Sequence, residues 1–231
     1  MKTVKVYSGN GMSSSLRELL PIFERAHDCK VVITYEPAQI LLREITAGRT
    51  ADLAILGGGV MDQVVTQGYI VLGSVRKLTS NGIGVGVLKG APKPDLSSVD
   101  AFKRALLNAR CVAYTTEGAS GIYFAGLIEK LGIADEIKAK AKTRAGGLIA
   151  EFVVSGEADI AVQQTPEIMA VAGVDYAGPI PAEVQNIAVG RAGVFTDAKE
   201  PQLAQALLDY LQTAEAARVY KARGLDPLAG S

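Results

Sequence analysis

A phrase that ends a helix and begins a strand occurs twice in this chain, as EITAGRTADLAIL at residues 44–56 and as EFVVSGEADIAVQQ at residues 151–164. Each copy has a helical pattern, a glycine, the pair Ala-Asp and a short apolar run. Gly48 and Gly156 suit the left-handed conformation that closes a helix. The apolar runs are continuous, as is typical of parallel strands covered on both faces. Two similar units in one chain predict two lobes, and a cleft between lobes is a place to bind a small molecule.

The composition is that of a globular protein and argues against two classes of function. Lys and Arg number 24, as do Asp and Glu, so the formal net charge is zero. A nucleic-acid-binding protein usually has a basic excess or a basic stripe, and the sequence has neither. No stretch approaches the roughly 18 apolar residues that span a bilayer. We therefore expect no nucleic-acid partner and no direct membrane insertion.

The chain begins directly with a strand pattern at residues 4–7, without the apolar region of a signal peptide. This N-terminal sequence is compatible with two cellular locations. The protein is either cytoplasmic, or it is the mature form of an exported protein whose leader has been replaced by Met1.

Residue types that commonly carry catalysis are scarce. Cys29 and Cys111 do not make a disulfide framework and are expected to be unpaired and structural. His27 is the only histidine, and its place at a helix end favours a surface cap. Neither a Ser-His-Asp set, a Cys-His pair nor a cluster with metal-ligand spacing is present, so we expect no metal, no cofactor and no catalytic residue of these kinds. An enzyme would need Glu, Tyr or Lys as its base, and Glu117 and Glu183 are the candidates, although a solvated or structural role suits each better.

Strand patterns alternate with helical ones, which predicts an α/β protein. Pro21 lies inside the first helix and is expected to bend or break it. The Gly-rich run 82–88 and the long strand 186–195 are interpreted as two strands that cross between the lobes. Lobe one then comprises residues 1–80 and 191–231, and lobe two comprises residues 81–190. Strands are predicted at 4–7, 31–35, 53–56, 111–114 and 160–162, and helices at 13–26, 37–48, 60–67, 101–109, 121–131, 147–154, 201–212 and 215–223.

Five segments follow one another in a characteristic order. They are the loop 8–12 after the first strand, the strand 51–55, the loop and helix 115–123, the turn 156–160 and the tail 213–225. Their order resembles that of type II periplasmic solute-binding proteins, in particular the molybdate-binding branch of the binding proteins of ABC transporters. The resemblance implies two Rossmann-like lobes joined by two crossover strands, which close about a hinge on a small anion. It also implies a periplasmic location and an ABC transporter membrane component as partner, and we expect a monomer.

The chain departs from the oxyanion binders of this family at the positions of their hydroxyl groups. These proteins place a Ser in the first loop and another before the second helix, where this chain has Gly11 and the pair Ala38-Gln39. The Tyr expected after the last strand of lobe two is replaced by 162–164, Val-Gln-Gln. Together with the segment 178–183, GPIPAE, this resembles a less characterised branch near aconitate-isomerase-like members. The resemblance implies a small organic di- or tricarboxylate as ligand in place of molybdate.

The preferred reading is therefore a solute-binding protein without catalysis, and the alternative is an isomerase of a small tricarboxylate on the same fold. A weaker alternative is a dinucleotide-binding fold. The segment 9–14, GNGMSS, follows a strand and opens a helix, and Glu36 ends the next strand, as in the dinucleotide fingerprint. Ser14 stands where that fingerprint has its third glycine.

The candidate binding residues lie in loops that follow strands and open helices. Free N–H groups at helix N-termini bind an anion without net positive charge, and glycines let the anion approach the backbone. Ser, Asn, Gln and Tyr side chains add donors, and an Arg could pair with a carboxylate through two hydrogen bonds. The predicted ligand-binding residues are Ser8, Asn10, Gly11, Met12, Gln39, Ser120, Gly121, Tyr123, Arg144, Gly147, Gln163 and Gln164.

Overall fold

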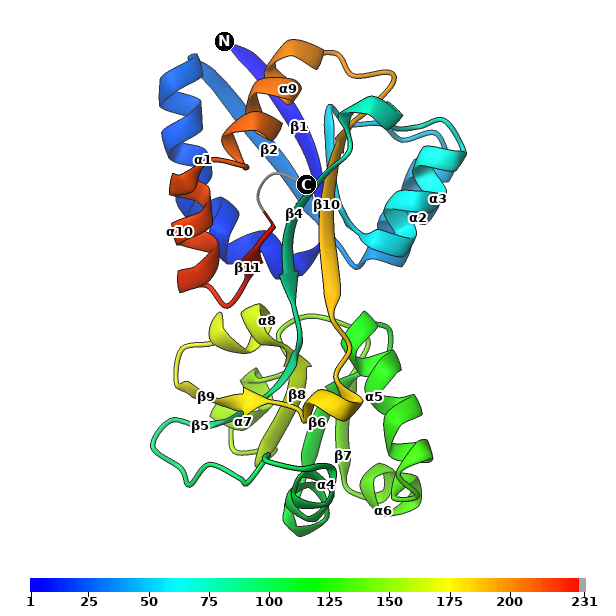
Figure 1. Ribbon diagram of the computed structural model, residues 1–231, viewed down its shortest axis with the longest axis vertical. Coiled ribbons are helices and arrows are strands. Elements are labelled where there is room, and N and C mark those ends of the chain that lie inside the picture. Colours follow the sequence, from blue (N-terminus) through cyan, green and yellow to red (C-terminus); the bar gives the residue numbers. More distant parts are fainter. Residues whose placement is uncertain (229–231) are drawn as a thin grey trace. The chain divides into compact units, whose positions relative to one another are not determined.

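The computed structural model describes residues 1–228, which form two compact α/β units (Figure 1). Unit 1 contains residues 1–80 and the segment from Ala188 onward, and unit 2 contains residues 81–187. The sequence placed the return to unit 1 at Arg191, which lies inside the strand that begins at Ala188. The chain thus passes between the units twice, so unit 1 is built from both ends of the chain.

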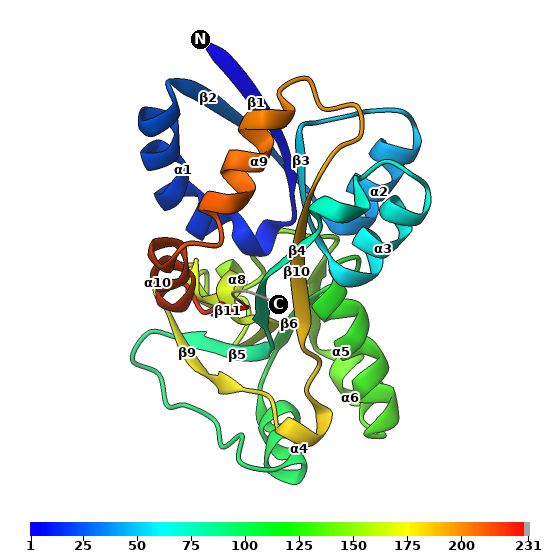
Figure 2. The same ribbon diagram turned by 45° about the horizontal axis from the view of Figure 1, so that its top comes forward.

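Unit 1 has a mixed sheet with the strand order β11-β4-β10-β3-β1-β2. Strands β1, β2 and β3 are parallel, whereas β10 is antiparallel to β3. Strands β4 and β10, which lead to and from unit 2, lie side by side (Figure 2). The elements are β1 Lys2–Ser8, η1 Asn10–Met12, α1 Ser13–His27, β2 Cys29–Tyr35, α2 Ala38–Thr46, β3 Leu53–Gly57, α3 Gly58–Thr66, η2 Leu72–Ser74, β4 Arg76–Asn81, β10 Ala188–Val194, α9 Pro201–Tyr210, α10 Ala214–Ala222 and β11 Asp226–Pro227.

The first copy of the repeated phrase forms β3, and its apolar side chains alternate between two cores. Leu53 and Ile55 pack in a cluster with side chains of α1, α9 and α10. Ala54 and Leu56 pack on the other face with side chains of α2 and α3. Figure 1 shows these two helical layers on either side of the sheet. The continuous apolar run is therefore explained, because both faces of this strand are buried.

Unit 2 has a second mixed sheet with the strand order β7-β6-β8-β5-β9. Strands β6, β7 and β8 are parallel, and β5 is antiparallel to both β8 and β9. The elements are β5 Ile83–Leu88, α4 Val99–Asn108, β6 Val112–Thr115, α5 Ala119–Lys130, α6 Ala134–Ala139, β7 Ala141–Arg144, α7 Glu151–Val154, β8 Ile160–Gln164, α8 Thr165–Met169, β9 Val174–Pro179 and η3 Ala182–Val184.

The second copy of the phrase forms β8 and repeats the packing of β3. Ile160 and Val162 belong to the cluster that includes Phe102 of α4 and Phe124 of α5. Ala161 belongs to a second cluster with side chains of the loop before α7 and of α7 itself. The α/β prediction is therefore confirmed in both units.

The two connections between the units are tied together inside unit 2 by Gln185. Its Oε1 accepts a hydrogen bond from the Ile83 N–H at 2.7 Å, and its Nε2 donates to the Ile83 carbonyl at 2.9 Å. A Cβ on Gly82 would lie 2.8 Å from the Gln185 Cδ. A side chain at position 82 would therefore have to displace the Gln185 amide that joins the two connections.

Several elements differ from the expected ones. Helix α1 runs from Ser13 to His27 with Pro21 inside it, so the proline does not break the helix. The helix expected at 147–154 is shorter, because residues 145–150 form turns and only Glu151–Val154 is helical. Strands β4, β7, β9 and β11 and helix α6 were not expected. Gly48 and Gly156 adopt φ angles of 86° and 77°, as the repeated phrase predicted.

The aspartates of the two phrases hold the sheets at the amino ends of the strands. Asp52 is buried, and its carboxylate accepts hydrogen bonds from the backbone N–H groups of Lys5 at 2.7 Å, Lys199 at 2.7 Å and Glu200 at 2.9 Å. These bonds join the start of β3 to β1 and to the backbone that leads into α9. Asp159 accepts from the Arg110 backbone N–H at 2.7 Å, just before β6. An aspartate therefore accepts backbone N–H groups at the start of the sheet in each unit.

Helix α5 packs against the end of β6 more closely than a side chain would allow. A Cβ on Gly121 would lie 1.8 Å from the Thr115 carbonyl oxygen and 2.5 Å from Thr115 Oγ1. Further along the same helix, a Cβ on Gly126 would meet no atom within 4 Å. The contact at Gly121 fixes where the first turn of α5 stands relative to the sheet.

We predict that Asp52→Asn lowers the free energy of unfolding by about 2–4 kcal/mol, because one amide oxygen cannot serve N–H groups on two sides and a buried donor loses its partner. Asp159→Asn is the matched control. Its side chain is 40% exposed, so water replaces the lost acceptor and the expected loss is about 1 kcal/mol. Urea unfolding of both variants checks this, and equal losses would contradict the role given to Asp52.

For the two glycines of α5 we expect changes of opposite sign. Gly121→Ala should destabilise the protein by about 1–3 kcal/mol or more, since the backbone of α5 or β6 must move. Gly126→Ala should stabilise it by about 0.5–1 kcal/mol, the usual gain in an open helical position. The two melting temperatures should therefore lie on opposite sides of the wild-type value. A stable Gly121→Ala variant would show that the close approach is not required.

Candidate functional site

Several helices of unit 1 begin at the carboxyl edge of its parallel strands. Strands β1, β2 and β3 end together, because Ser8 is paired with Tyr35 on one side and with Ile55 on the other. The elements η1, α2 and α3 start directly after these strands. Their N-cap residues make no side-chain capping hydrogen bond. The first N–H groups of a helix have no partner within it, so this edge presents backbone donors.

The predicted residues of unit 1 divide into buried and accessible ones. Ser8 is fully buried, and its hydroxyl donates to the Gly9 carbonyl at 3.1 Å. The Met12 side chain is buried in the core, where the Thr79 hydroxyl contacts its sulfur at 3.6 Å. Asn10 and Gly11 are partly buried, and Gln39 is exposed. The structure therefore brings Asn10, Gly11 and Gln39 to the carboxyl edge, whereas the Ser8 and Met12 side chains serve the interior.

Unit 2 repeats this arrangement at the carboxyl edge of β6 and β8. Helix α5 follows β6, helix α8 follows β8, and neither N-cap makes a side-chain hydrogen bond. Ser120 and Gly121 lie in the first turn of α5 and are buried. Beneath them, the buried Thr115 Oγ1 has no hydrogen-bond partner within residues 1–228. Two helix starts and a buried hydroxyl thus meet at this edge.

Gln163 is buried and holds the loop between β7 and α7. Its Oε1 accepts from the Ile149 N–H at 3.0 Å, and its Nε2 donates to the Gly147 carbonyl at 2.8 Å. Gly147 has a φ of 88°, which a residue with a side chain rarely adopts. Gln164, the N-cap of α8, is partly exposed. The structure therefore brings Gly147, Gln163 and Gln164 together, with Gln163 in a positioning role.

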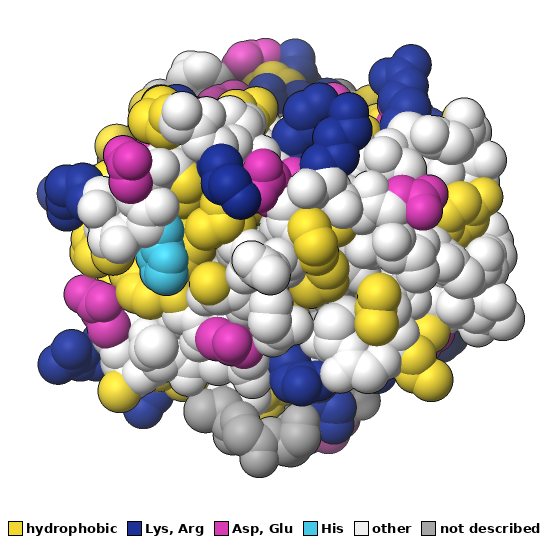
Figure 3. Space-filling model, turned by 90° about the horizontal axis from the view of Figure 1, so that it is seen from above, with side chains coloured by type: hydrophobic (Ala, Val, Ile, Leu, Met, Phe, Trp, Pro, Cys, Tyr) yellow, Lys and Arg dark blue, Asp and Glu magenta, His cyan; other side chains and the backbone are white. Residues whose placement is uncertain are grey.

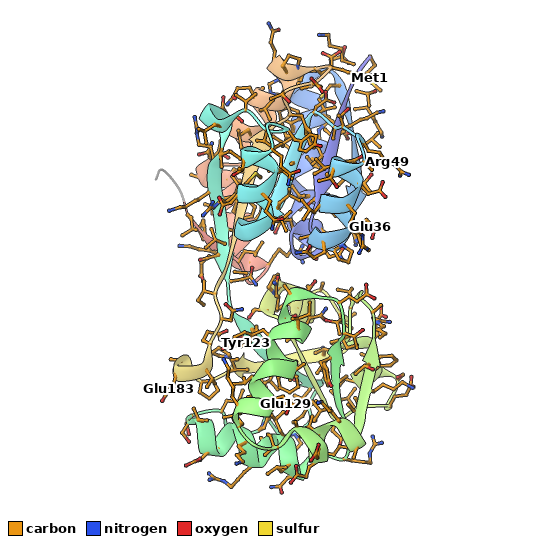
Figure 4. The ribbon with its side chains drawn as sticks, turned by 90° about the vertical axis from the view of Figure 1, so that its right-hand side faces the viewer. Met1, Glu36, Arg49, Tyr123, Glu129 and Glu183 are labelled. Carbon is orange, nitrogen blue, oxygen red and sulfur yellow. The ribbon has the colours of Figure 1, made fainter. Side chains whose placement is uncertain are left out.

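The side chains of Arg144 and Tyr123 are occupied within unit 2. The Arg144 guanidinium donates to the Leu148 carbonyl and to Glu151 at 2.9 Å, and it lies over the Phe152 ring. The Tyr123 hydroxyl donates to the Val184 carbonyl at 3.0 Å, and Figure 4 shows Tyr123 on α5 beside the segment that carries Glu183. A ligand would have to displace these partners, although the buried Arg144 Nε has no hydrogen-bond partner within residues 1–228. The assignment of all twelve predicted residues to a binding site stays a prediction.

Sequence reasoning missed Glu167, which lies in the first turn of α8. Burial raises the pKa of its carboxyl to about 7, and hydrogen bonds from the Gln164 backbone N–H and the Gln163 side chain partly oppose this rise. Glu117 and Glu183, the candidates from the sequence, are both exposed. The available signal was the position of Glu167, three residues after a strand end and next to Pro166, which is typical of a helix start.

The other edge of the unit 2 sheet carries a groove of about 680 Å³. It is lined by the loop Ala91–Asp95, by α4 and by the amino end of β8. The groove therefore lies away from the uncapped helix starts. On the face shown in Figure 3, basic and acidic side chains are interspersed.

Residues 1–228 contain neither a membrane-spanning helix nor a cluster of metal-binding side chains. The helices there are too short or too polar to cross a bilayer. Groups of three or more His, Cys, Asp or Glu side chains arranged to hold a metal ion are also absent from this range. Cys29 and Cys111 are free thiols.

Comparison with known proteins gives the family. The sequence pattern of the bacterial extracellular solute-binding proteins matches residues 4–226. The chain is 32% identical to an aconitate isomerase of a Pseudomonas species, over 98% of this chain and 88% of that protein. It is 24% identical to the molybdate-binding protein of Escherichia coli, over 96% of this chain and 88% of that protein.

Solved structures agree on the fold. The periplasmic molybdate-binding protein of Azotobacter vinelandii superimposes with a TM-score of 0.78 at 19% identity, over 96% of this chain and 98% of that one. With its two α/β units, two connections and matched family pattern, the chain belongs to the bacterial extracellular solute-binding proteins, in the molybdate-binding-protein-like branch of the type II periplasmic class.

Proposed function

We propose that this protein binds a small organic di- or tricarboxylate for an ABC transporter. The observation that carries the proposal is the row of uncapped helix starts at the carboxyl edges, those of η1, α2, α3, α5 and α8. Two other helices have side-chain caps, since Ser98 of α4 accepts from the Ala101 N–H at 3.2 Å and Thr213 of α10 accepts from the Ala216 N–H at 3.3 Å. The N-caps of α6 and α7 make no such bond. An anion is the natural acceptor for the donors left over.

A carboxylate suits these donors better than a tetrahedral oxyanion. The positions where the family's oxyanion binders have hydroxyls hold Gly11, Gln39 and the Gln163-Gln164 pair in this chain. An amide side chain both donates and accepts, so it can bind a carboxylate or a hydroxyl of the ligand. The relative that is 32% identical is named for aconitate, which is a tricarboxylate.

The family implies a transporter, and the proposal also includes the partner, the oligomeric state and the location of the protein. The partner is the membrane component of an ABC transporter, and the protein acts as a monomer in the periplasm. Closure of two lobes over the anion, which the resemblance implies, stays a prediction. Small-angle X-ray scattering tests this closure, because the radius of gyration should change when the ligand is added.

A thermal-shift screen tests the ligand class. Aconitate, citrate and shorter dicarboxylates are compared with molybdate and sulfate. A ligand present at about 100 times its Kd should add about 2.7 kcal/mol to the stability of the folded state, which raises the melting temperature by several degrees. We expect this shift with at least one di- or tricarboxylate and none with molybdate. A shift with molybdate alone would contradict the proposal.

A second candidate function is isomerisation of an unsaturated tricarboxylate. It is favoured by the higher identity to the aconitate isomerase than to the molybdate-binding protein, 32% against 24% over nearly the whole chain. Incubation with cis-aconitate, followed by chromatography of the two isomers, separates binding from turnover. For an isomerase we expect trans-aconitate to form at a rate proportional to protein concentration. If the isomer ratio stays unchanged although aconitate binds tightly, the protein binds its ligand without isomerising it.

A further inference from the structure

We propose that the groove at the amino edge of the unit 2 sheet binds a monocarboxylate with an aliphatic chain, such as a medium-chain fatty acid. The groove has a volume of about 680 Å³, inside the usual range of about 300–1,000 Å³ for small-molecule sites. It lies at the opposite edge of this sheet from the helix starts of α5 and α8. This site is therefore separate from the one proposed above for di- and tricarboxylates.

One wall of the groove is a loop that strand β9 holds in place. Residues 91–95, Ala-Pro-Lys-Pro-Asp, belong to the connection from β5 to α4 (Figure 1). The Gly90 N–H donates to the Asp175 carboxylate at 2.9 Å. The Lys93 ammonium donates to the Tyr176 carbonyl at 2.9 Å. The two prolines restrict the backbone further. The wall is therefore fixed before a ligand arrives, which lowers the entropic cost of binding.

The floor of the groove is apolar and reaches the core of unit 2. Val87 of β5, Ala101 of α4 and Ile160 of β8 line the groove, and each is at most 6% exposed. Ala105 and Ala109 continue this surface along α4. Among residues 1–228, no aromatic ring lines the groove. Such a floor suits a saturated chain, since each methylene group that it buries strengthens binding by up to about fourfold.

The charged side chains of the lining are engaged with the protein, with one exception. Arg110 and Asp159 form an ion pair at 3.0 Å. The Asp95 carboxylate accepts from a backbone N–H at 2.9 Å, and Lys93 donates to the carbonyl named above. Arg104 is exposed and makes neither a hydrogen bond nor an ion pair within residues 1–228. A guanidinium without a partner beside an apolar floor is complementary to the carboxylate of an amphipathic acid.

A second donor lies beside Arg104. Asn108 follows it by four residues on α4, a spacing that places two side chains on the same face of a helix. Asn108 also lines the groove, and its amide has no hydrogen-bond partner in the described part of the chain. The three basic and two acidic side chains of the lining leave one net positive charge, which matches a monoanion. The groove thus offers a floor for a chain and two donors for one carboxylate.

A purely structural groove is the competing explanation. Arg104 attracts the Asp95 carboxylate and contributes to the lowered pKa of Asp95, after the larger effect of the hydrogen bonds from Ser97. If this attraction is all that Arg104 provides, its substitution changes no ligand affinity.

Two variants and a control separate these explanations. Arg104→Gln removes the charge at an exposed position, so the fold should tolerate it. Ala105→Leu places a larger side chain in the groove. The control is Arg218→Gln. Arg218 is an exposed residue of α10 in unit 1, and it likewise makes no ion pair within residues 1–228.

The experiment titrates decanoate, below the concentration at which it forms micelles, into protein with isotope-labelled alanine methyl groups. NMR follows these methyl signals, and calorimetry measures the affinity. Decanol has the same chain without the charge, and butyrate has the same carboxylate on a short chain. We expect decanoate to shift the signals of Ala101, Ala105 and Ala109 saturably. Decanol should bind about fivefold more weakly, as expected for the loss of one exposed ion pair, and butyrate more weakly still.

The variants should respond differently to the three compounds. Arg104→Gln should weaken decanoate binding about fivefold and leave decanol binding unchanged. Ala105→Leu should weaken both by about tenfold or more, because a filled groove buries fewer methylene groups. Arg218→Gln should match the wild type. Melting temperatures show which variants fold, and Arg104→Gln alone decides the test if Ala105→Leu does not fold.

Each other result overturns the proposal. Decanoate may not be bound by the groove if no signal saturates or if alanines of both units shift alike, and both results count against it. An affinity for decanoate that is unchanged in Arg104→Gln, or in a folded Ala105→Leu variant, does the same. Binding of citrate or aconitate at the carboxyl edges enters none of these readouts, so failure of either site leaves the other in place.

Discussion

The first N–H groups of each helix must find an acceptor, and this constraint organises both units. A helix that starts without a partner for these groups leaves polar atoms unsatisfied, which is costly when they are buried. Ser98 and Thr213 meet the constraint for α4 and α10 with their own side chains. At the carboxyl edges the helix starts of η1, α2, α3, α5 and α8 have no side-chain caps. Backbone donors at these edges are therefore available to a ligand, which is the basis of the proposed anion binding.

The two aspartates of the repeated phrase act at the opposite, amino ends of the strands. Asp52 and Asp159 accept backbone N–H groups at the amino ends of β1 and β6, so that the start of each sheet is held by a carboxylate. Since a strand is stiff, fixing its amino end also fixes where its carboxyl end stands. Gly121 then sets the height of α5 above β6 by direct backbone contact. The positions of the donors are therefore consequences of packing that can be traced to single residues.

The sequence predicted the fold better than the details of the site, and the reason is physical. The burial of Leu53–Leu56 on both faces of the sheet was predicted by the continuous apolar run, which is typical of a covered strand. The positive φ angles of Gly48 and Gly156 were predicted from their positions after helical patterns. The partners of Arg144, Tyr123 and Gln163 depend on loops whose course no local pattern specifies. The short strands β7 and β9 carry little periodicity, so they were missed.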